Sequence, residues 1–78
     1  MKEELELFAK NLNTYLDYYG LTQADLADRL GYSPAAVSHW CKGLKFPRLG
    51  TIDRMTELFK CRRSDLLERE VDPTTIET

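Results

Sequence analysis

Hydrophobic and polar positions alternate along the first twenty residues with the period of an α-helix. Charged and amide side chains fall between apolar positions that recur at steps of three and four residues: Leu5, Phe8, Leu12, Tyr15 and Tyr19. Gly20 then stands where many helices end in a residue of left-handed conformation. The pattern predicts a first helix over residues 3–19.

A second, shorter helix is predicted after this glycine. Thr22 and Asp25 have the spacing of a capping box, and Leu21 is placed to pack on Leu26 just outside the first turn. Gly31 is expected to end this helix. Its buried edge is expected to consist of Leu26, Ala27 and Leu30.

A third helix is predicted from Ser33, as the N-cap, and Pro34 at the first helical position. It should run to Lys42 and stop at Gly43, with Val37 and Trp40 turned to the core. The positions then left facing outward are Ala35, Ala36, Ser38, His39 and Lys42. Two short helices joined at Gly31, with the small Ala27 where they cross, indicate a helix-turn-helix over about residues 23–43. A helix presented in this way fits the major groove of DNA.

The remaining chain predicts two more helices. Residues 44–49 contain Pro47 and are expected to form a loop, after which Thr51 can cap a fourth helix. The buried face of this fourth helix is expected to consist of Ile52, Met55, Leu58 and Phe59. A short fifth helix follows over residues 64–68, presenting Leu66 and Leu67. We therefore expect an all-α, five-helix domain over residues 1–70, and a polar tail or the start of a linker over residues 71–78.

The net charge of −2 is unevenly distributed over the 78 residues. The two ends are acidic, whereas residues 21–63 carry eight basic and four acidic side chains. Between Asp28 and Asp53 there is no acidic residue, and this window contains most of the predicted helix-turn-helix. Local charge, and not the total, governs contact with phosphates. The distribution is compatible with a nucleic-acid partner.

Several classes of protein are disfavoured by what the sequence lacks. It has no apolar stretch typical of a membrane span or a signal peptide, so an intracellular, cytoplasmic protein is expected. Cys41 and Cys61 form no CxxC pair and are expected to be reduced thiols, while a single histidine argues against a zinc site. No nucleophile–base pair or phosphate-binding glycine loop is recognisable. We expect no enzyme activity, cofactor, metal or small-molecule substrate.

The order of short motifs resembles the Cro/CI-type (lambda-repressor-like) helix-turn-helix family. The similar segments are LTQADLA at 21–27, LGYS at 30–33, VSHW at 37–40, Gly43 with Pro47, LFKC at 58–61 and SDLL at 64–67. Each motif alone is weak, but the set in this order covers about residues 8–68. The resemblance implies a protein that binds a specific sequence of double-stranded DNA.

The resemblance also implies which residues contact DNA. Gln23 corresponds to a glutamine that binds a backbone phosphate, although an ordinary exposed helix residue is the alternative. Pro34, Ala35, Ser38 and His39 occupy positions used for base edges. The first two can offer only apolar contact, for example with a thymine methyl group, and His39 could equally contact a phosphate. The full candidate set is Gln23, Ser33, Pro34, Ala35, Ser38, His39, Lys42, Lys45 and Arg48.

The three cations at the end of this set fit phosphate contacts, and Arg48 could instead enter the minor groove. A solvated basic loop is the alternative interpretation.

Two features of the sequence depart from the family pattern. Many relatives pair an acidic residue after the tryptophan with an arginine on the first helix, but this sequence has Cys41 and Leu16 there. The change puts phosphate contacts from the first helix in doubt. Arg62 stands where a polar cap is expected before the last helix, so the start of that helix is left open.

Together these features predict a transcriptional regulator, in particular a phage- or prophage-type repressor that binds a palindromic operator as a homodimer. Met55, Phe59 and the fifth helix are candidates for the contact between subunits. The chain could be a whole Cro-like protein or the N-terminal domain of a longer repressor. A protein-interaction module, such as an antitoxin or an adaptor with the same fold, is the alternative, and the acidic ends favour it slightly.

Overall fold

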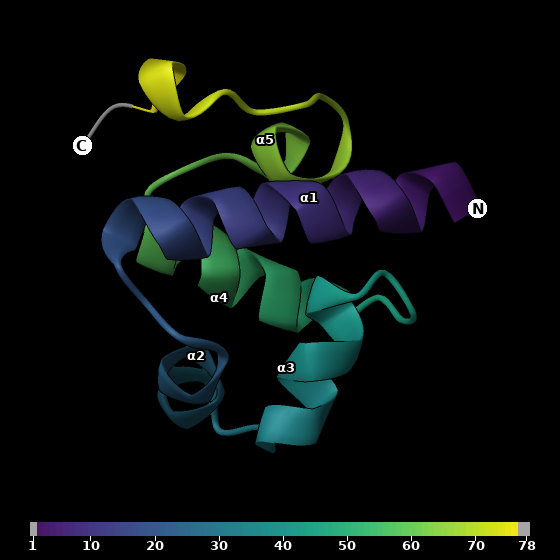
Figure 1. Ribbon diagram of the computed structural model, residues 1–78, viewed down its shortest axis with the longest axis vertical. Coiled ribbons are helices and arrows are strands. Elements are labelled where there is room, and N and C mark those ends of the chain that lie inside the picture. Colours follow the sequence, from purple (N-terminus) through teal and green to yellow (C-terminus); the bar gives the residue numbers. More distant parts are fainter. Residues whose placement is uncertain (1, 77–78) are drawn as a thin grey trace.

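A computed structural model describes residues 2–76 and shows them to be all-helical (Figure 1). The elements in chain order are α1 (Lys2–Tyr19), α2 (Gln23–Leu30), α3 (Pro34–Cys41), α4 (Leu49–Phe59), α5 (Arg63–Leu67) and the short 3-10 helix η1 (Pro73–Thr75). The described part of the chain contains no β-strand. The predicted all-α, five-helix fold is confirmed.

The long helix α1 separates two groups of elements. Figure 1 shows α2 and α3 on one side of α1, and α5 with the C-terminal segment on the other. The side of α1 that faces the core contributes the buried residues Phe8, Leu12, Tyr15 and Leu16. Tyr15 stacks on Phe59 of α4 with 5.1 Å between the ring centroids. Each large apolar side chain buried here contributes roughly 1.5–3 kcal/mol to stability.

Met55 and Phe59 belong to this core and are both 0% exposed. They were candidates, with the fifth helix, for the contact between subunits, and for these two residues the candidacy is wrong, because their side chains offer no exposed surface to a second copy. Leu58, on the same helix, is half-buried, while Ile52 is buried as predicted.

Helix α4 begins three residues earlier than the sequence predicts. Thr51 was expected to cap it, but the helix starts at Leu49 and Arg48 occupies the N-cap position without a side-chain cap bond within the described residues. Thr51 is instead buried, and its hydroxyl lies 2.8 Å from the hydroxyl of Tyr32. Thr51 therefore lies inside α4, and its hydroxyl makes this tertiary contact instead of capping the helix.

The start of α5 is fixed by the residue three positions after Arg62. The Asp65 carboxylate accepts a hydrogen bond from the Arg62 backbone N–H at 3.0 Å and also forms an ion pair with Arg69. The backbone hydrogen bond, with help from Arg69, holds the pKa of Asp65 below its usual value despite partial burial. Arg62 is therefore the cap residue of α5 although its own side chain cannot accept a bond.

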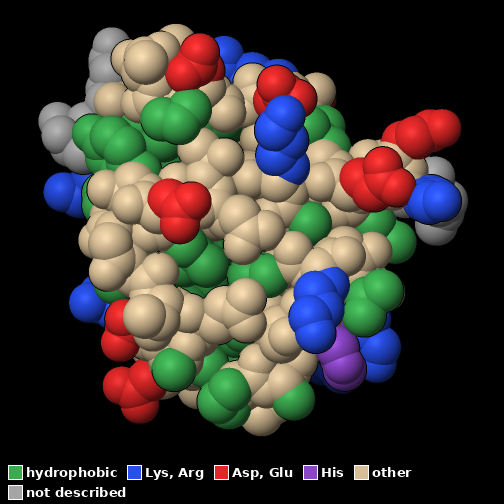
Figure 2. All heavy atoms as spheres, in the orientation of Figure 1, with side chains coloured by type: hydrophobic (Ala, Val, Ile, Leu, Met, Phe, Trp, Pro, Cys, Tyr) green, Lys and Arg blue, Asp and Glu red, His purple; other side chains and the backbone are tan. Residues whose placement is uncertain are grey.

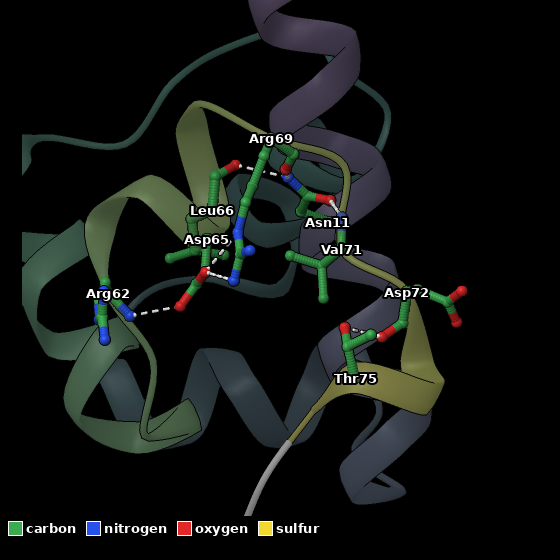
Figure 3. Close-up of polar contacts among 8 residues, drawn as sticks. All are labelled: Asn11, Arg62, Asp65, Leu66, Arg69, Val71, Asp72 and Thr75. Atoms are coloured by element: carbon green, nitrogen blue, oxygen red, sulfur yellow. Dashed lines mark hydrogen bonds and ion pairs between the residues drawn. The ribbon is translucent and has the colours of Figure 1, made fainter.

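The segment after α5 folds back onto α1 through a buried amide. Asn11 is fully buried, and its Nδ2 donates to the carbonyl oxygens of Leu66 and Arg69 at 3.0 and 2.7 Å (Figure 3). Its Oδ1 accepts from the Val71 backbone N–H at 2.9 Å, and Val71 is itself buried. The predicted division of the chain after residue 70 stays a prediction. Residue 71, assigned to the polar tail, is nevertheless part of the core.

Within residues 2–76, no helix is long and apolar enough to cross a membrane. No group of three or more His, Cys, Asp or Glu side chains among residues 2–76 is placed to hold a metal ion. Cys41 and Cys61 are free thiols, as predicted.

Candidate nucleic-acid interface

The start of α2 is closed by the predicted capping box. Thr22 Oγ1 accepts a hydrogen bond from the Asp25 N–H at 3.0 Å, and the Asp25 carboxylate accepts from the Thr22 N–H at 2.9 Å. These hydrogen bonds hold the pKa of Asp25 below its usual value. Gln23 is thereby fixed as the first residue of the helix, with its side chain exposed.

The turn between α2 and α3 is built from a glycine and a second cap. Gly31 has a φ of 75°, in the left-handed region, and the Tyr32 N–H donates to the Ala27 carbonyl at 2.9 Å. Ser33 Oγ then accepts from the Ala36 N–H at 3.2 Å, with Pro34 in the first turn of α3. Both helix boundaries at the turn agree with the prediction.

Two contacts that the sequence did not reveal brace this turn against α4. Tyr32 is 37% exposed, and its ring lies edge-on to Trp40 with 4.9 Å between the centroids, while its hydroxyl contacts Thr51. The Arg54 guanidinium donates to the carbonyls of Leu30 and Arg29, at 2.8 and 3.2 Å, where α2 ends. Tyr32, the aromatic residue directly after Gly31, is the one local signal in the sequence that could have indicated these contacts between the turn and α4.

The other end of α3 is tied to α1. Asn13 Nδ2 donates to the Cys41 carbonyl at 3.0 Å and to the Ala9 carbonyl at 2.9 Å. Gly43, with a φ of 73°, lies so close to α1 that a Cβ there would meet the Leu5 carbonyl oxygen at 3.4 Å. Leu16 and Cys41, which replace the ion pair of many relatives, are both in the hydrophobic core. The orientation of α3 is therefore fixed at both of its ends.

The exposed side of α3 carries most of the candidate DNA-binding residues. Ser33, Pro34, Ala35 and His39 are exposed, whereas Ser38 is half-buried. Ala36 was expected to face outward, but it is half-buried against the core, because it lies one helical turn before the buried Trp40 and shares a face of α3 with it. The four remaining candidates are also exposed: Gln23, Lys42, Lys45 and Arg48.

Basic side chains gather around this helix. Figure 2 shows the single histidine with Lys or Arg side chains beside it, on the flank of the molecule where α3 lies in Figure 1. A hollow of about 540 Å³ lies elsewhere, lined by Tyr15, Cys61 and Asp65 among others, with no residue of α2 or α3. The candidate interface is therefore a projecting helix with a cationic flank, a shape suited to a groove of a duplex and not to enclosing a small molecule.

The fold and this exposed helix define a helix-turn-helix domain. A family profile described as "Helix-turn-helix domain" matches residues 3–69. The chain belongs to the helix-turn-helix domain family, and is thus a DNA-binding domain of the kind found in transcription regulators.

One solved structure is similar over nearly the whole chain. It is the solution structure of the SOS-response transcriptional repressor LexA from Eubacterium rectale, with 33% identity and a TM-score of 0.83. The match covers 97% of this chain and 84% of that chain. No curated protein matches the sequence. The resemblance to Cro/CI-type domains is confirmed at the level of family and fold.

Proposed function

We propose that this chain is the DNA-reading domain of a phage- or prophage-type repressor that binds a two-fold symmetric operator as a homodimer in the cytoplasm. The observation that carries the proposal is α3, which is exposed along one side, fixed at both ends and followed by a segment whose charged residues are all basic. The similar structure is named a transcriptional repressor, which supports the same role. Repression would follow from occupying the promoter, without catalysis.

The exposed residues divide into two roles. Pro34 and Ala35 would make apolar contacts with base edges, while Ser38 and His39 would supply hydrogen bonds. Ser33 would stand beside them, at the start of the helix. The phosphate contacts are assigned to Gln23, Lys42, Lys45 and Arg48.

The proposal is tested by selecting bound sequences from a pool of random duplexes at two salt concentrations. We expect enrichment of a two-fold symmetric site whose half-sites lie about one helical turn apart, and a steep fall in affinity with salt. Recovery of no preferred sequence, with feeble binding at both salts, would refute the proposal for this chain.

The acidic ends of the chain favour one alternative, an antitoxin or adaptor that uses the fold to bind a protein. The two functions differ in their need for the cations near α3. An adaptor should tolerate neutralisation of Lys42, Lys45 and Arg48, whereas a DNA-binding regulator should lose its activity.

A further inference from the structure

An exposed hydrophobic patch is formed by Leu44 and Phe46, in the segment that joins α3 to α4, and by Leu49, the first residue of α4. Leu44 and Leu49 are each 60% exposed and Phe46 is 39% exposed, so the patch holds three of the five exposed large hydrophobic residues within residues 2–76. A groove of about 400 Å³ continues it and is lined by Phe46, Leu49, Ile52 and Leu67 among others. Scattered exposed apolar residues are ordinary, but a cluster of them marks an interaction surface.

The hydrophobic patch is held in place by the fold. The Leu44 N–H donates to the His39 carbonyl at 2.9 Å, and the Phe46 ring lies 5.6 Å from the ring of Phe8, measured between centroids. Pro47, between Phe46 and Leu49, is buried. The three exposed side chains therefore project from an anchored segment, and a partner would not have to order it first.

We propose that this hydrophobic patch is the contact through which two copies of the chain meet on DNA, an inference that rests on the proposed function. The patch begins one residue after Gly43 and alternates with the exposed cations Lys45 and Arg48, so it borders the basic flank of α3. Figure 2 shows hydrophobic side chains on this flank next to the histidine and its basic neighbours. Whatever covers the patch must then stand beside α3 on the duplex.

A second copy on the neighbouring half-site stands in that place. Half-sites read by paired domains of this type lie about 34 Å apart, one turn of DNA. The Cα atoms of this chain span 30 × 27 × 20 Å, so two copies placed side by side match that spacing. The half-buried Leu67 lines the groove beside the patch, so α5 would take part in the contact between the two copies. Met55 and Phe59 would not, because they are buried.

The size of the hydrophobic patch indicates that the two copies associate on DNA and not free in solution. Three partly exposed side chains offer on the order of a few hundred Å² of apolar surface. A standard stable interface buries about 800 Å² on each partner. A contact this small becomes effective when a shared duplex holds both copies close together. We therefore expect a monomer in dilute solution and cooperative binding to the full site.

The test compares binding to one selected half-site with binding to the full site. For the unchanged chain we expect each copy to bind the full site about 10-fold to 100-fold more tightly than the isolated half-site, within the usual range of coupling between sites. In the double variant Leu44→Gln/Leu49→Gln this cooperativity should be lost, while half-site affinity stays within about twofold, because the change adds no charge. Tyr18→Gln, which alters a 39% exposed residue of α1, is the matched control. This variant should keep both the cooperativity and the half-site affinity of the unchanged chain.

A second measurement does not depend on any variant. Insertion of about five base pairs between the half-sites turns the copies to opposite sides of the duplex and should abolish the cooperativity. Cooperativity that survives this insertion, or survives the double variant, would overturn the inference. A stable dimer of the free chain at micromolar concentration, measured by sedimentation, would overturn it as well. Failure of the unchanged chain to bind even a half-site would instead refute the proposed function itself.

Discussion

At the scale of single residues, the exposed start of α3 is largely apolar. Pro34 and Ala35 have no side-chain hydrogen-bonding group, and the Ser33 hydroxyl oxygen already accepts the Ala36 N–H. In the major groove the thymine C5-methyl is the apolar group that such residues can contact. Under the proposed function, polar discrimination would depend on residues one turn later, Ser38 and His39.

Replacement of each thymine in the selected half-site by deoxyuridine tests this division. The replacement removes one methyl group and leaves the base pairing unchanged. At the position facing Pro34 and Ala35 we expect a loss of about 0.8 kcal/mol, or roughly fourfold in affinity, the value of one buried methyl group. Fluorescence anisotropy titrations would measure it, with the same replacement outside the half-site as control. Equal affinity at every position would contradict apolar reading.

A second prediction concerns Gly31, the residue in the turn. Its φ of 75° lies in the left-handed region, but a Cβ built there would meet no heavy atom within 4 Å. Gly31→Ala should therefore cost about 1–2 kcal/mol from backbone strain alone. Gly50→Ala is the matched control, because Gly50 is helical and also open to solvent, and alanine there should be neutral or stabilising by up to about 1 kcal/mol. Urea denaturation followed by circular dichroism measures both; equal effects would argue against strain at Gly31.

At the scale of elements, local signals located the ends of α2 and α3 and failed at the start of α4. Thr22 with Asp25 and Ser33 with Pro34 act through bonds to residues three positions away, so the sequence displays them directly. Thr51 has the chemistry of a cap as well. Its oxygen is used by Tyr32, 19 residues distant, and no local pattern shows that contact.

In the candidate site, too, features set by residues close in sequence could be predicted, and contacts between distant residues could not. Most of the exposed side of α3 could be predicted because the buried Val37 and Trp40 define the opposite side of one helix, although Ala36 is half-buried. The contacts that hold α3 in place could not, since Asn13 reaches Cys41 over 28 residues and Arg54 reaches Leu30 over 24. Asn11 and Val71 were missed for the same reason, as they meet only when the C-terminal segment folds across α1.

The short helix α5 should make stability depend on pH through Asp65. The pKa of this carboxyl is lowered in the folded chain by the Arg62 N–H and by Arg69. Its contribution is therefore complete above the ordinary aspartate value of about 3.9 and is lost as the pH falls through the lower folded value. Melting temperatures measured from pH 7 to pH 2.5 should fall on the acid side, and less steeply for Asp65→Asn.

Asp17→Asn, at an exposed position of α1, is the matched control for the loss of one carboxylate. It should follow the acid branch of the unchanged chain. The interpretation would be wrong if Asp65→Asn and Asp17→Asn gave the same curve as the unchanged chain, because the hydrogen-bonded carboxylate would then contribute nothing that depends on pH.

At the scale of the whole molecule, the net charge of −2 does not show that the basic side chains lie in separate places. Lys42, Lys45 and Arg48 lie in and after the end of α3, in the stretch of sequence without acids. Lys10 forms an ion pair with Glu70 of the C-terminal segment at 2.7 Å, and Lys60 and Arg62 line the hollow that contains no residue of α2 or α3. Two sets of three cations thus offer equal charge at different places.

Salt dependence can distinguish these sets. Each phosphate contact contributes about 0.9 to the slope of log K against log salt, so changing Lys42, Lys45 and Arg48 to Gln should reduce that slope by about 2 to 3. The same change at Lys10, Lys60 and Arg62 removes as much charge but should leave the slope nearly unaltered, since counterions are released only where cations meet phosphates. Titrations of the selected duplex at four salt concentrations measure both slopes. If the two triple variants behaved alike, net charge and not the flank of α3 would govern binding, and the assignment of the interface would have to be abandoned.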